Sequence, residues 1–556
     1  MSGSRREFAS YIPWRFYLLL GLIALSVLGL VTRVIYLVVF EKPFLQQQSN
    51  ERVLRKIITP VFRGMILDRN HFPLAVSTKV FTIWFNPQTF SPDTKSLHKL
   101  SSLLKLSPSS IKKLSQTYKI KNREFGYLQR GVSPQLANKV KLLAIPGLYA
   151  METSRRYYPE AEVAAHLVGF TNIDDKGQEG LELAYNQWLS GSSGKKWVIK
   201  DPLGRIIEDV DHTAERPGND LILSIDRRIQ YMAYRELLSG IFTNEASAGS
   251  VIVLDVETGE VLAMVNYPSF NPNNRGKLIP SHFRNRAITD TFEPGSTIKA
   301  FSIASAFETG QFNADSVIDT APGYMRVDRN IVRDGKNNGE MTIAQILQIS
   351  SNVGVTKIVL NSSADQLYNL LHKVGFGEIT GIGFPGEEGG SLQKPKGAFT
   401  LATLGFGYGL AVTPLQLARA YSVLANGGIK KPVTLLKVNQ APQGELVMKK
   451  KVADEMLQLL EAVLNKGGTG TAARIPGYRI AGKTGTAKLV GEQGYQKHRY
   501  ESSFVGIAPL SHPRVIVAVV IHDPQGKQYY GGPVAGPIFK NVMQETLRIL
   551  DVPHDS

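Results

Sequence analysis

The feature that most constrains this chain is a long apolar run near its N-terminus. Nearly every residue from Phe16 to Thr32 is apolar, and after Arg33 the run resumes from Val34 to Phe40. The whole run is longer than the roughly 20 residues that a membrane-spanning helix needs. We therefore expect a cytoplasmic tail at residues 1–15 and a transmembrane anchor at residues 16–40.

A cleaved signal peptide is the alternative explanation of this run. The run is longer than the usual apolar region of a signal peptide, and no small-residue cleavage site is evident near its end, so an uncleaved anchor is favoured. Arg5, Arg6 and Arg15 argue for a cytoplasmic N-terminus, whereas Lys42 and other basic residues after the run reduce the asymmetry. Arg33, inside the span, is expected to snorkel or to pair with a partner helix.

Length, charge and cysteine content limit the rest of the molecule. The 556 residues exceed one ordinary hydrophobic core, so we expect two soluble domains besides the anchor. The net charge of +17 suits anionic partners, and because no nucleic-acid-binding motif is evident, a membrane or cell-envelope setting is favoured. The chain has no cysteine, which excludes disulfides, thiolate metal sites and cysteine nucleophiles.

Residues 41–220 form a mixed region without a strong catalytic signal. Its landmarks are Arg63–Asn70, Arg155–Pro159 and Gly177–Tyr185, which, taken alone, are typical of turns and solvated charges between strands. The stretch 94–140 is rich in Ser, Lys and Leu and predicts short amphipathic helices. Turn-forming residues near 211–220 mark a domain boundary, so the second domain is expected at 221–556.

The second domain has strands at both of its ends and helices between them. An apolar strand at 221–225 and a helix from Arg227 come first, followed by two strands that read as an antiparallel hairpin, and three more strands lie near the C-terminus. The five strands of the hairpin and the C-terminal group are expected at Ser250–Val256, Glu260–Val265, Tyr478–Val490, Ser503–Ala508 and Arg514–Ile521. This order predicts an α+β fold, in which a five-stranded antiparallel sheet carries a helical subdomain and a closing helix at Val534–Leu550. A cleft is expected where the subdomains meet.

Two helices of the middle region have recognisable ends. Thr342 is placed to cap a short helix that ends near Ile349, and another helix starts soon after it. Thr413 with Pro414 opens a further helix that stops at Asn426, where two glycines follow.

Ser296 and Lys299 form a candidate nucleophile and base. Pro294 and Gly295 interrupt the preceding segment, and apolar residues recur at helical spacing up to Glu308, so a buried helix is expected to begin at or just before Ser296. A residue three positions on lies on the same helical face, about 5–6 Å away between Cβ atoms, which brings the Lys299 amine to the Ser296 hydroxyl. A lysine takes that proton only if burial or a second cation keeps the amine neutral.

Two more short motifs follow in the sequence. They are Ser350 with Asn352, and Lys483–Gly485 followed by Thr486. Each alone occurs often by chance, as a turn or a strand end. Ser-x-x-Lys, Ser-x-Asn and Lys-Thr-Gly together are the set found in penicillin-binding proteins and serine β-lactamases, and their order here favours one shared cleft.

Acyl transfer from a peptide explains each of the five predicted catalytic residues. Ser296 attacks, Lys299 takes its proton, and Ser350 relays a proton to the departing amine. Asn352 both donates and accepts, and therefore holds Lys299 and the substrate amide. Lys483 is the second cation, which lowers the pKa of Lys299 and attracts an anionic substrate.

The remaining predicted site residues would bind substrate. Thr484 and Thr486 offer hydroxyls to a carboxylate, and Gly485 leaves room for an extended peptide to lie along the strand edge.

The chain resembles class B penicillin-binding proteins, and more closely the division-specific peptidoglycan D,D-transpeptidases of Gram-negative bacteria. The resemblance covers nearly the whole chain. One departure is His71, where such pedestals usually continue with Gly after Asn70, and it affects a local turn. Besides the three motifs, the resemblance is carried by Arg63–Asn70, Gly177–Tyr185, Thr258–Asn273, Phe292–Lys299, Ala481–Ala487 and Tyr529–Gly532.

This resemblance implies a specific activity. The enzyme would cross-link septal stem peptides in the periplasm through an acyl-enzyme on Ser296, and β-lactams would trap that serine by mimicking D-Ala-D-Ala. Backbone N–H groups of Ser296 and Thr486 would hold the oxyanion. The inner-membrane anchor and an elongated α+β pedestal, residues 41–220, would contact an FtsW-type septal glycosyltransferase and other divisome proteins. No metal or cofactor is implied.

Three other functions compete with this one. An elongation-type class B transpeptidase differs only in softer sequence features. A serine β-lactamase is suggested by Glu461–Asn465, which matches a Glu-x-x-Leu-Asn pattern, but this segment reads as the end of an ordinary amphipathic helix and lies too near Lys483. A β-lactam sensor would need a larger cytoplasmic part, whereas a division scaffold is compatible with catalysis.

Overall fold

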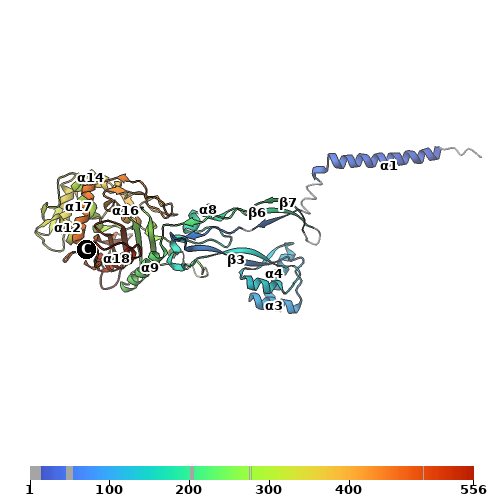
Figure 1. The fold of residues 1–556 in the computed structure, drawn as a ribbon, viewed down its shortest axis with the longest axis horizontal. Helices are drawn as coiled ribbons and strands as arrows, with labels where there is room; N and C mark the ends of the chain where they lie inside the picture. The colour runs from blue at the N-terminus through green and yellow to red at the C-terminus, as the bar shows by residue number, and fades with distance from the viewer. Residues whose placement is uncertain are drawn as a thin grey trace, which may run out of the picture. The chain divides into compact units, whose positions relative to one another are not determined.

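The computed structural model of the protein describes residues 14–44, 54–59, 61–200, 206–274, 276, 279–491 and 494–555. The chain divides into two compact units, one formed by residues 1–61 with 192–216 and the other by residues 62–191 with 217–556. Figure 1 labels some of the elements of both units.

The first unit holds the apolar helix and a small sheet. Helix α1 (Trp14–Val39) has 26 residues, and within the described part of the chain it is the one helix long and apolar enough to cross a membrane. At about 1.5 Å per residue it is longer than the hydrocarbon layer is thick. Arg33 lies 4.0 Å from Glu41, just past the helix end. Strands β1 (Leu54–Thr59), β6 (Gly194–Lys200) and β7 (Ile206–Thr213) form an antiparallel sheet in that order.

Residues 62–191, which fall within the expected pedestal, are built on one long strand of the second unit. Strand β3 (Pro73–Phe85) pairs with β2 (Ile66–Leu67) near its start and with both β4 (Gly126–Val132) and β5 (Leu148–Tyr157) further along. Strand β8 (Leu221–Ile222) is shorter than the expected 221–225 strand and pairs with β2 in parallel. The region also has helices α6 (Ala165–Val168), α7 (Gly180–Ala184) and α8 (Asn186–Ser190).

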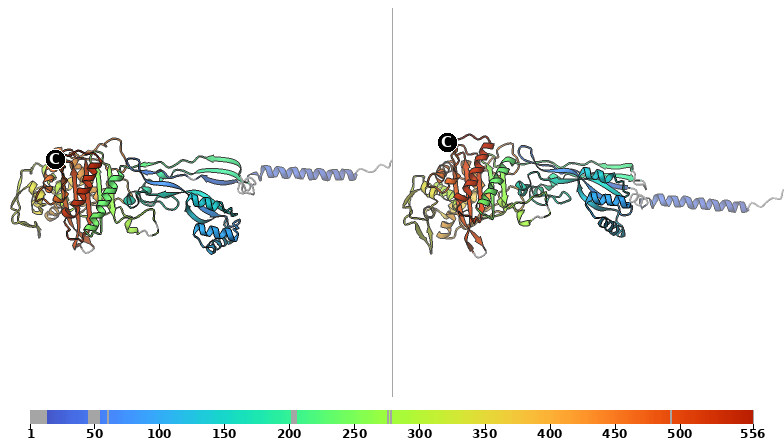
Figure 2. Two further views of the ribbon diagram at one scale, coloured as in Figure 1. Left: turned by 60° about the horizontal axis from the view of Figure 1, so that its bottom comes forward. Right: turned by 90° about the horizontal axis from the view of Figure 1, so that it is seen from below.

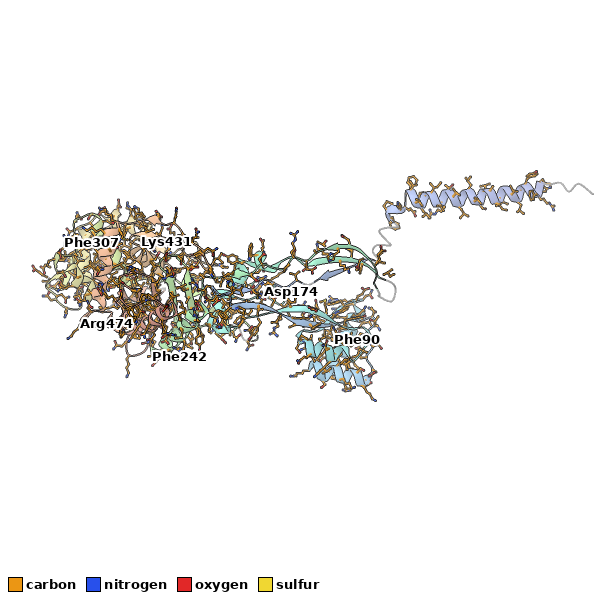
Figure 3. All side chains as sticks on the ribbon, in the orientation of Figure 1. Phe90, Asp174, Phe242, Phe307, Lys431 and Arg474 are labelled. Carbon is orange, nitrogen blue, oxygen red and sulfur yellow. The ribbon has the colours of Figure 1, made fainter. Side chains whose placement is uncertain are left out.

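Three amphipathic helices cover one face of this sheet, as the Ser, Lys and Leu pattern predicts. They are α3 (Thr94–Leu104), α4 (Pro108–Ile120) and α5 (Pro134–Lys141), and their buried leucines, isoleucine and valine pack with Phe81 and Ile83 of β3. Phe90, labelled in Figure 3, lies in the loop before α3 and contacts Phe85, with ring centroids 5.1 Å apart. The helices are capped by Asp93, Ser107 and Ser133, each of which accepts a backbone N–H.

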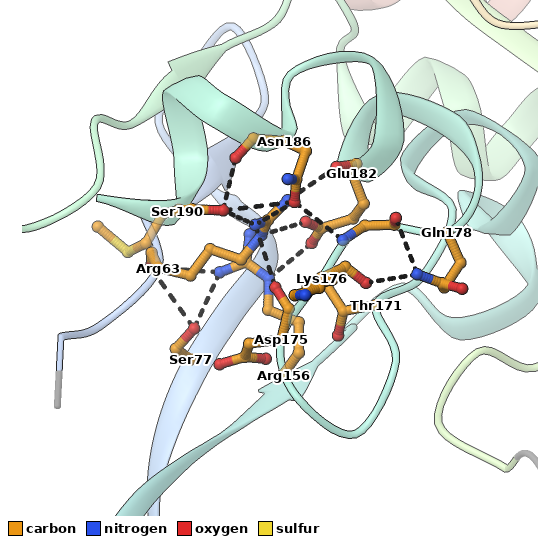
Figure 4. A network of polar contacts seen from close by, with 12 residues as sticks. Arg63, Ser77, Arg156, Thr171, Asp175, Lys176, Gln178, Glu182, Asn186 and Ser190 are labelled. Atoms are coloured by element: carbon orange, nitrogen blue, oxygen red, sulfur yellow. Dashed lines mark hydrogen bonds and ion pairs between the residues drawn. The ribbon is translucent and has the colours of Figure 1, made fainter. Parts of the chain in front are cut away.

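Several charged residues that the sequence predicts to be solvated form a buried network instead. Glu182 lies between two arginines, with Nε of Arg63 2.6 Å from Oε2 and Nε of Arg156 2.6 Å from Oε1 (Figure 4). Arg63 also donates to Asn186 Oδ1 and Ser190 Oγ. Because both guanidinium groups share the one Glu182 carboxylate, segments far apart in the sequence are held together by buried ion pairs.

The turn around His71 forms without the glycine that the family resemblance leads us to expect at this position. His71 has a φ of 64°, in the left-handed region, where L-residues are strained. The buried Asp68 carboxylate holds the turn by accepting the backbone N–H groups of Asn70 and Phe72, both at 2.8 Å.

The five-stranded antiparallel sheet is confirmed. Its order is β10-β9-β21-β20-β19, which leaves β19 on one edge. The strands are β9 (Ala248–Asp255), β10 (Val261–Tyr267), β19 (Ala481–Gly491), β20 (Gly494–Ala508) and β21 (Val515–His522). Helices α9 (Arg227–Thr243) and α18 (Gly531–Ile549) pack side by side on one face, so the predicted closing helix is also confirmed (Figure 2).

The helical subdomain lies between β10 and β19 in the sequence. Helix α16 covers the sheet face opposite to α18, and α11 packs on it, with the rings of Phe301 and Tyr421 5.4 Å apart. The helices are α10 (Arg286–Thr289), α11 (Lys299–Glu308), α12 (Ile343–Ile349), α13 (Asn352–Leu360), α14 (Ala364–Lys373), α15 (Ala398–Gly405), α16 (Pro414–Ala425) and α17 (Lys450–Glu461). Short strand pairs connect them: β11 (Val317–Asp319) with β14 (Glu340–Thr342), β12 (Tyr324–Val327) with β13 (Asn330–Arg333), β15 (Ser391–Leu392) with β16 (Leu410–Ala411), and β17 (Ile429–Lys430) with β18 (Glu445–Leu446).

The buried network predicts that replacing Glu182 destabilises the protein much more than replacing a surface glutamate, Glu152. Glu182→Ala leaves Arg63 and Arg156 buried without their counter-ion, so we expect the free energy of unfolding to fall by about 3–5 kcal/mol. Glu152→Ala is the control, because Glu152 pairs with Lys79 at the surface, where such pairs contribute about 0–1 kcal/mol. Urea unfolding of the two variants measures the difference, and equal midpoints would contradict it.

Candidate active site

The turn that carries Ser296 is wedged between two segments of the second unit. It is a 3-10 helix, Gly295–Ile298, which continues into α11, so the helix start expected at Ser296 is present in a tighter form. The Gly295 N–H donates to Gly407 O at 3.0 Å. On its other side, a Cβ added to Gly295, whose φ is +54°, would lie 3.1 Å from Thr486 O on β19. The turn therefore lies against the free edge of the sheet.

Lys299 is completely buried beneath this turn. Its Nζ donates to Ser350 O at 2.5 Å, to Ser350 Oγ at 3.1 Å and to Asn352 Oδ1 at 2.7 Å. Burial, and next the charge of Lys483, lower the pKa of Lys299 well below its usual range, whereas Asp334 acts in the opposite direction. Among the described residues, the Ser296 hydroxyl forms no hydrogen bond and is free to meet a substrate.

The Ser350–Asn352 segment is a sharp connection between two helices. Ser350 ends α12 in the left-handed conformation with a φ of 62°, and Ser351 caps α13 by accepting the Gly354 N–H. The predicted capping of α12 by Thr342 is present as a capping box with Gln345. This connection turns the Ser350 hydroxyl and the Asn352 amide toward Lys299.

Asp334 holds this connection in place, although no local sequence pattern points to it. Its Oδ1 accepts the backbone N–H groups of Asn352 at 2.6 Å and Val353 at 3.1 Å, and its Oδ2 accepts the Ser351 hydroxyl. A carboxylate at the first turn of α13 also favours the helix dipole. Asp334 follows β13, so the β12–β13 hairpin positions the Ser350–Asn352 segment.

Strand β19 supplies the Lys483–Thr486 motif at the edge of the sheet. Lys483 is completely buried, and this burial lowers its pKa to about 7. Thr484 Oγ1 donates to Thr469 Oγ1 at 2.9 Å, and Thr486 Oγ1 accepts the Gly531 N–H at 2.9 Å. Both threonines thus have fixed orientations, and an unpaired strand edge is available for an extended peptide.

The structure explains the glycine at position 485 by packing within the fold, whereas the sequence predicts that it leaves room for a peptide substrate. A Cβ at this position would lie 2.3 Å from Ser503 Oγ and 2.8 Å from Pro294 O. The missing side chain therefore lets the turn Gly295–Ile298 approach β19; because this turn carries the predicted nucleophile Ser296, we call it the nucleophile turn.

The predicted residues come together around one cleft of about 590 Å³. Ser296, Ser350, Asn352, Thr484 and Thr486 line it, whereas Lys299, Lys483 and Gly485 lie beneath its surface. Lining residues outside the predicted set are Ile349, Tyr408, Thr469, Ala487, Lys488, Tyr500, Tyr529, Tyr530, Gly531 and Gly532. Tyr529–Gly532 marks the family resemblance, but no local pattern points to Tyr408 or Thr469.

Two glutamates, Glu461 and Glu293, differ in their position relative to the cleft and in their partners. Glu461 ends α17 and forms a bidentate ion pair with Arg479, at 2.8 and 2.7 Å, and it does not line the cleft. Glu293 precedes the nucleophile turn, and its Oε1 accepts the Gly409 N–H at 2.8 Å and the Tyr495 hydroxyl at 3.2 Å. Burial raises the pKa of Glu293.

Comparison with known proteins agrees with this architecture. A family model described as penicillin binding protein transpeptidase domain matches residues 249–544, and one described as penicillin-binding protein dimerisation domain matches residues 58–223. The chain is 41% identical over 558 residues to peptidoglycan D,D-transpeptidase FtsI of Escherichia coli strain K12, across 99% of this chain and 94% of the relative.

Another relative and a solved structure agree. Peptidoglycan D,D-transpeptidase FtsI of Buchnera aphidicola subsp. Schizaphis graminum is 38% identical over 551 residues, across 98% of this chain and 97% of the relative. The crystal structure of a peptidoglycan synthetase from Bifidobacterium adolescentis matches with a TM-score of 0.72 and 26% identity, over 90% of this chain and 98% of that one. The chain therefore belongs to the class B penicillin-binding proteins, with a transpeptidase and a dimerisation domain.

Proposed function

We propose that this chain is a serine D,D-transpeptidase that cross-links peptidoglycan stem peptides during cell division and is a target of β-lactams. The observation that carries the proposal is the buried Lys299 amine, which contacts Ser350 and Asn352 in the same cleft that Ser296 lines. Relatives named peptidoglycan D,D-transpeptidase match almost the whole chain, which supports this activity over that of a hydrolase or a sensor.

Acylation uses Lys299 as the base. Its lowered pKa favours the neutral amine, which takes the proton as Ser296 Oγ bonds to the carbonyl carbon of the D-Ala-D-Ala bond. The oxyanion receives hydrogen bonds from the backbone N–H groups of Ser296 and Thr486. When the peptide bond breaks, Ser350 passes a proton from Lys299 to the leaving D-alanine amine.

Transfer reverses these proton movements. The amine of a neighbouring stem peptide attacks the ester carbonyl and loses a proton through Ser350 to Lys299, and Ser296 regains its hydrogen as the ester breaks. The donor peptide extends along the β19 edge, where protonated Lys483 and the hydroxyls of Thr484 and Thr486 attract its terminal carboxylate.

Membrane anchoring places this chemistry outside the cytoplasm. Residues 16–40, most of which belong to helix α1, span the bacterial inner membrane, with residues 1–15 in the cytoplasm and the catalytic domain in the periplasm. Residues 41–220 form a non-catalytic pedestal, and residues 221–556 form the transpeptidase domain. The anchor and pedestal contact an FtsW-type septal glycosyltransferase and other divisome proteins.

Covalent labelling tests the nucleophile. We expect Ser296→Ala to abolish labelling by a fluorescent penicillin, because the variant lacks the hydroxyl that forms the acyl ester. Ser302→Ala is the matched control on α11, since Ser302 bonds to Gly405 O away from the cleft, and it should still be labelled. Intact-protein mass over hours should show a slowly decaying adduct whose lifetime is unchanged by Glu461→Ala. A fleeting adduct that Glu461→Ala prolongs would indicate a β-lactamase.

The pKa of Lys483 predicts how acylation depends on pH. Its charge is present below a pKa of about 7 and is lost as the pH rises through that value, so the second-order acylation rate should decline on the alkaline side. Arginine stays charged at every accessible pH, so Lys483→Arg should move this decline to higher pH, even if the overall rate falls. Stopped-flow acylation by a penicillin measures both profiles, and identical alkaline limbs would assign the decline to another group.

Asp334 predicts a shift in the acidic limb. Asp334→Asn keeps the shape of the side chain but removes the charge that raises the pKa of Lys299. Lys299 should therefore become neutral at lower pH, and the acidic limb of the pH profile of acylation should move to lower pH. Asp334→Ala also releases the Ser350–Asn352 segment and should slow acylation by about 100-fold. Asp328→Asn, in the same hairpin, is the control, because its partner is the distant Phe399 N–H. An unmoved acidic limb in Asp334→Asn would refute the electrostatic role.

A further inference from the structure

The helical module that covers β3 carries much of the chain's positive charge. Residues 93–141, with α3, α4 and α5, contain 11 Lys and Arg residues against two acidic residues, which gives more than half of the net charge of +17. The nine lysines of this module form no ion pair with any residue that the structure describes. This surface is therefore an uncompensated cationic patch.

The ends of two helices gather at one place in the module. The Gln88 amide donates to Asn122 Oδ1 just past the end of α4, while Ser91 N–H donates to Pro146 O after α5. Asn86 N–H donates to Gly147 O in the same way. The loop at residues 86–91, which includes Phe90 in Figure 3, thus contacts Asn122 just past α4 and the segment 146–147, which begins five residues after α5 ends.

Two bulky aliphatic side chains project at these helix ends. Ile120 is 86% exposed and Leu142 is 84% exposed, which is more than any large apolar side chain of α1, where the highest value is 72% for Leu25. Each lies beside lysines, Ile120 between Lys119 and Lys121 and Leu142 after Lys141. Lysines at helix C-termini interact favourably with the helix dipole. The dipole does not explain why an aliphatic side chain is exposed to water at the same place.

We propose that this basic tip, Lys119–Arg123 together with Lys139–Leu142, docks on the anionic phospholipid surface of the bilayer that holds α1. The proposal rests on the membrane anchoring proposed above and is independent of the acyl-transfer chemistry. Cationic side chains around exposed aliphatic residues are the combination that binds the interface of an anionic bilayer.

Tethering makes a weak contact sufficient. Because α1 and the tip belong to one chain, docking is an intramolecular event with a high effective concentration, so a few lysines and two aliphatic side chains suffice. Docking orients the helical module on the membrane and restricts the directions in which β3 leads toward the catalytic domain.

The absence of cysteine allows a direct test on the full-length chain. Thr89→Cys, in the exposed loop beside the tip, is labelled with an environment-sensitive fluorophore, and the chain is reconstituted into vesicles with or without phosphatidylglycerol. On anionic vesicles we expect a blue shift and quenching by a lipid-borne quencher, both lost at high salt. Gln311→Cys, exposed on the catalytic domain, is the control position and should report water throughout.

Charge and apolar variants separate the contributions. Lys119→Gln with Lys121→Gln should weaken tip contact by about fivefold per charge, and Ile120→Ser with Leu142→Ser should remove the blue shift. Lys112→Gln with Lys113→Gln removes as many charges from the start of α4 and should have little effect. Labelling by fluorescent penicillin shows that each variant is folded.

Two outcomes would overturn the proposal. Flotation with the vesicles reports insertion of α1 separately, so a tip label that stays in water on floating anionic vesicles excludes docking and leaves the patch to an acidic protein partner. A signal that is equal on zwitterionic vesicles and insensitive to salt would show proximity imposed by the tether instead.

Discussion

The chemistry of this protein depends on one buried amine. Lys299 has no contact with solvent, and three oxygen atoms of Ser350 and Asn352 surround its Nζ. Burial disfavours the charged form and the charge of Lys483 adds repulsion, so the pKa of Lys299 falls well below its usual range and the neutral amine, which can accept a proton, is favoured. The same hydrogen bonds keep the amine beside Ser350, the proposed proton relay.

The surrounding fold keeps this amine dry and in register. The nucleophile turn lies against β19 because Gly485 and Gly295 let two backbones approach, and Tyr421 fixes the turn by donating to Thr297 O at 2.8 Å. Asp334 fixes the Ser350–Asn352 segment from outside the cleft. The three motifs lie on separate elements. Their arrangement therefore depends on contacts with residues outside the motifs, such as Tyr421 and Asp334.

Charge is used in opposite ways in the two parts of the second unit. Around Glu182, two arginines and a carboxylate exclude water and act as a structural lock. In the helical module, lysines at the surface form no ion pair with any described residue and lie beside exposed aliphatic residues, which suits an external partner. The difference follows from burial. A buried charge needs its counter-ion within the fold, whereas an exposed charge is solvated by water and remains available to bind a partner.

Local patterns by themselves determined the apolar helix, the five strands, the closing helix and the three motifs, because spacing and turn residues act between near neighbours in the chain. They did not reveal that Arg63, Arg156 and Glu182 are buried, that Gly485 serves packing, or that Asp334 supports the site. Those properties arise between residues far apart in the sequence, such as Arg63 and Glu182, which are 119 positions apart, and only the folded arrangement decides which side chains lose water and which partner replaces it.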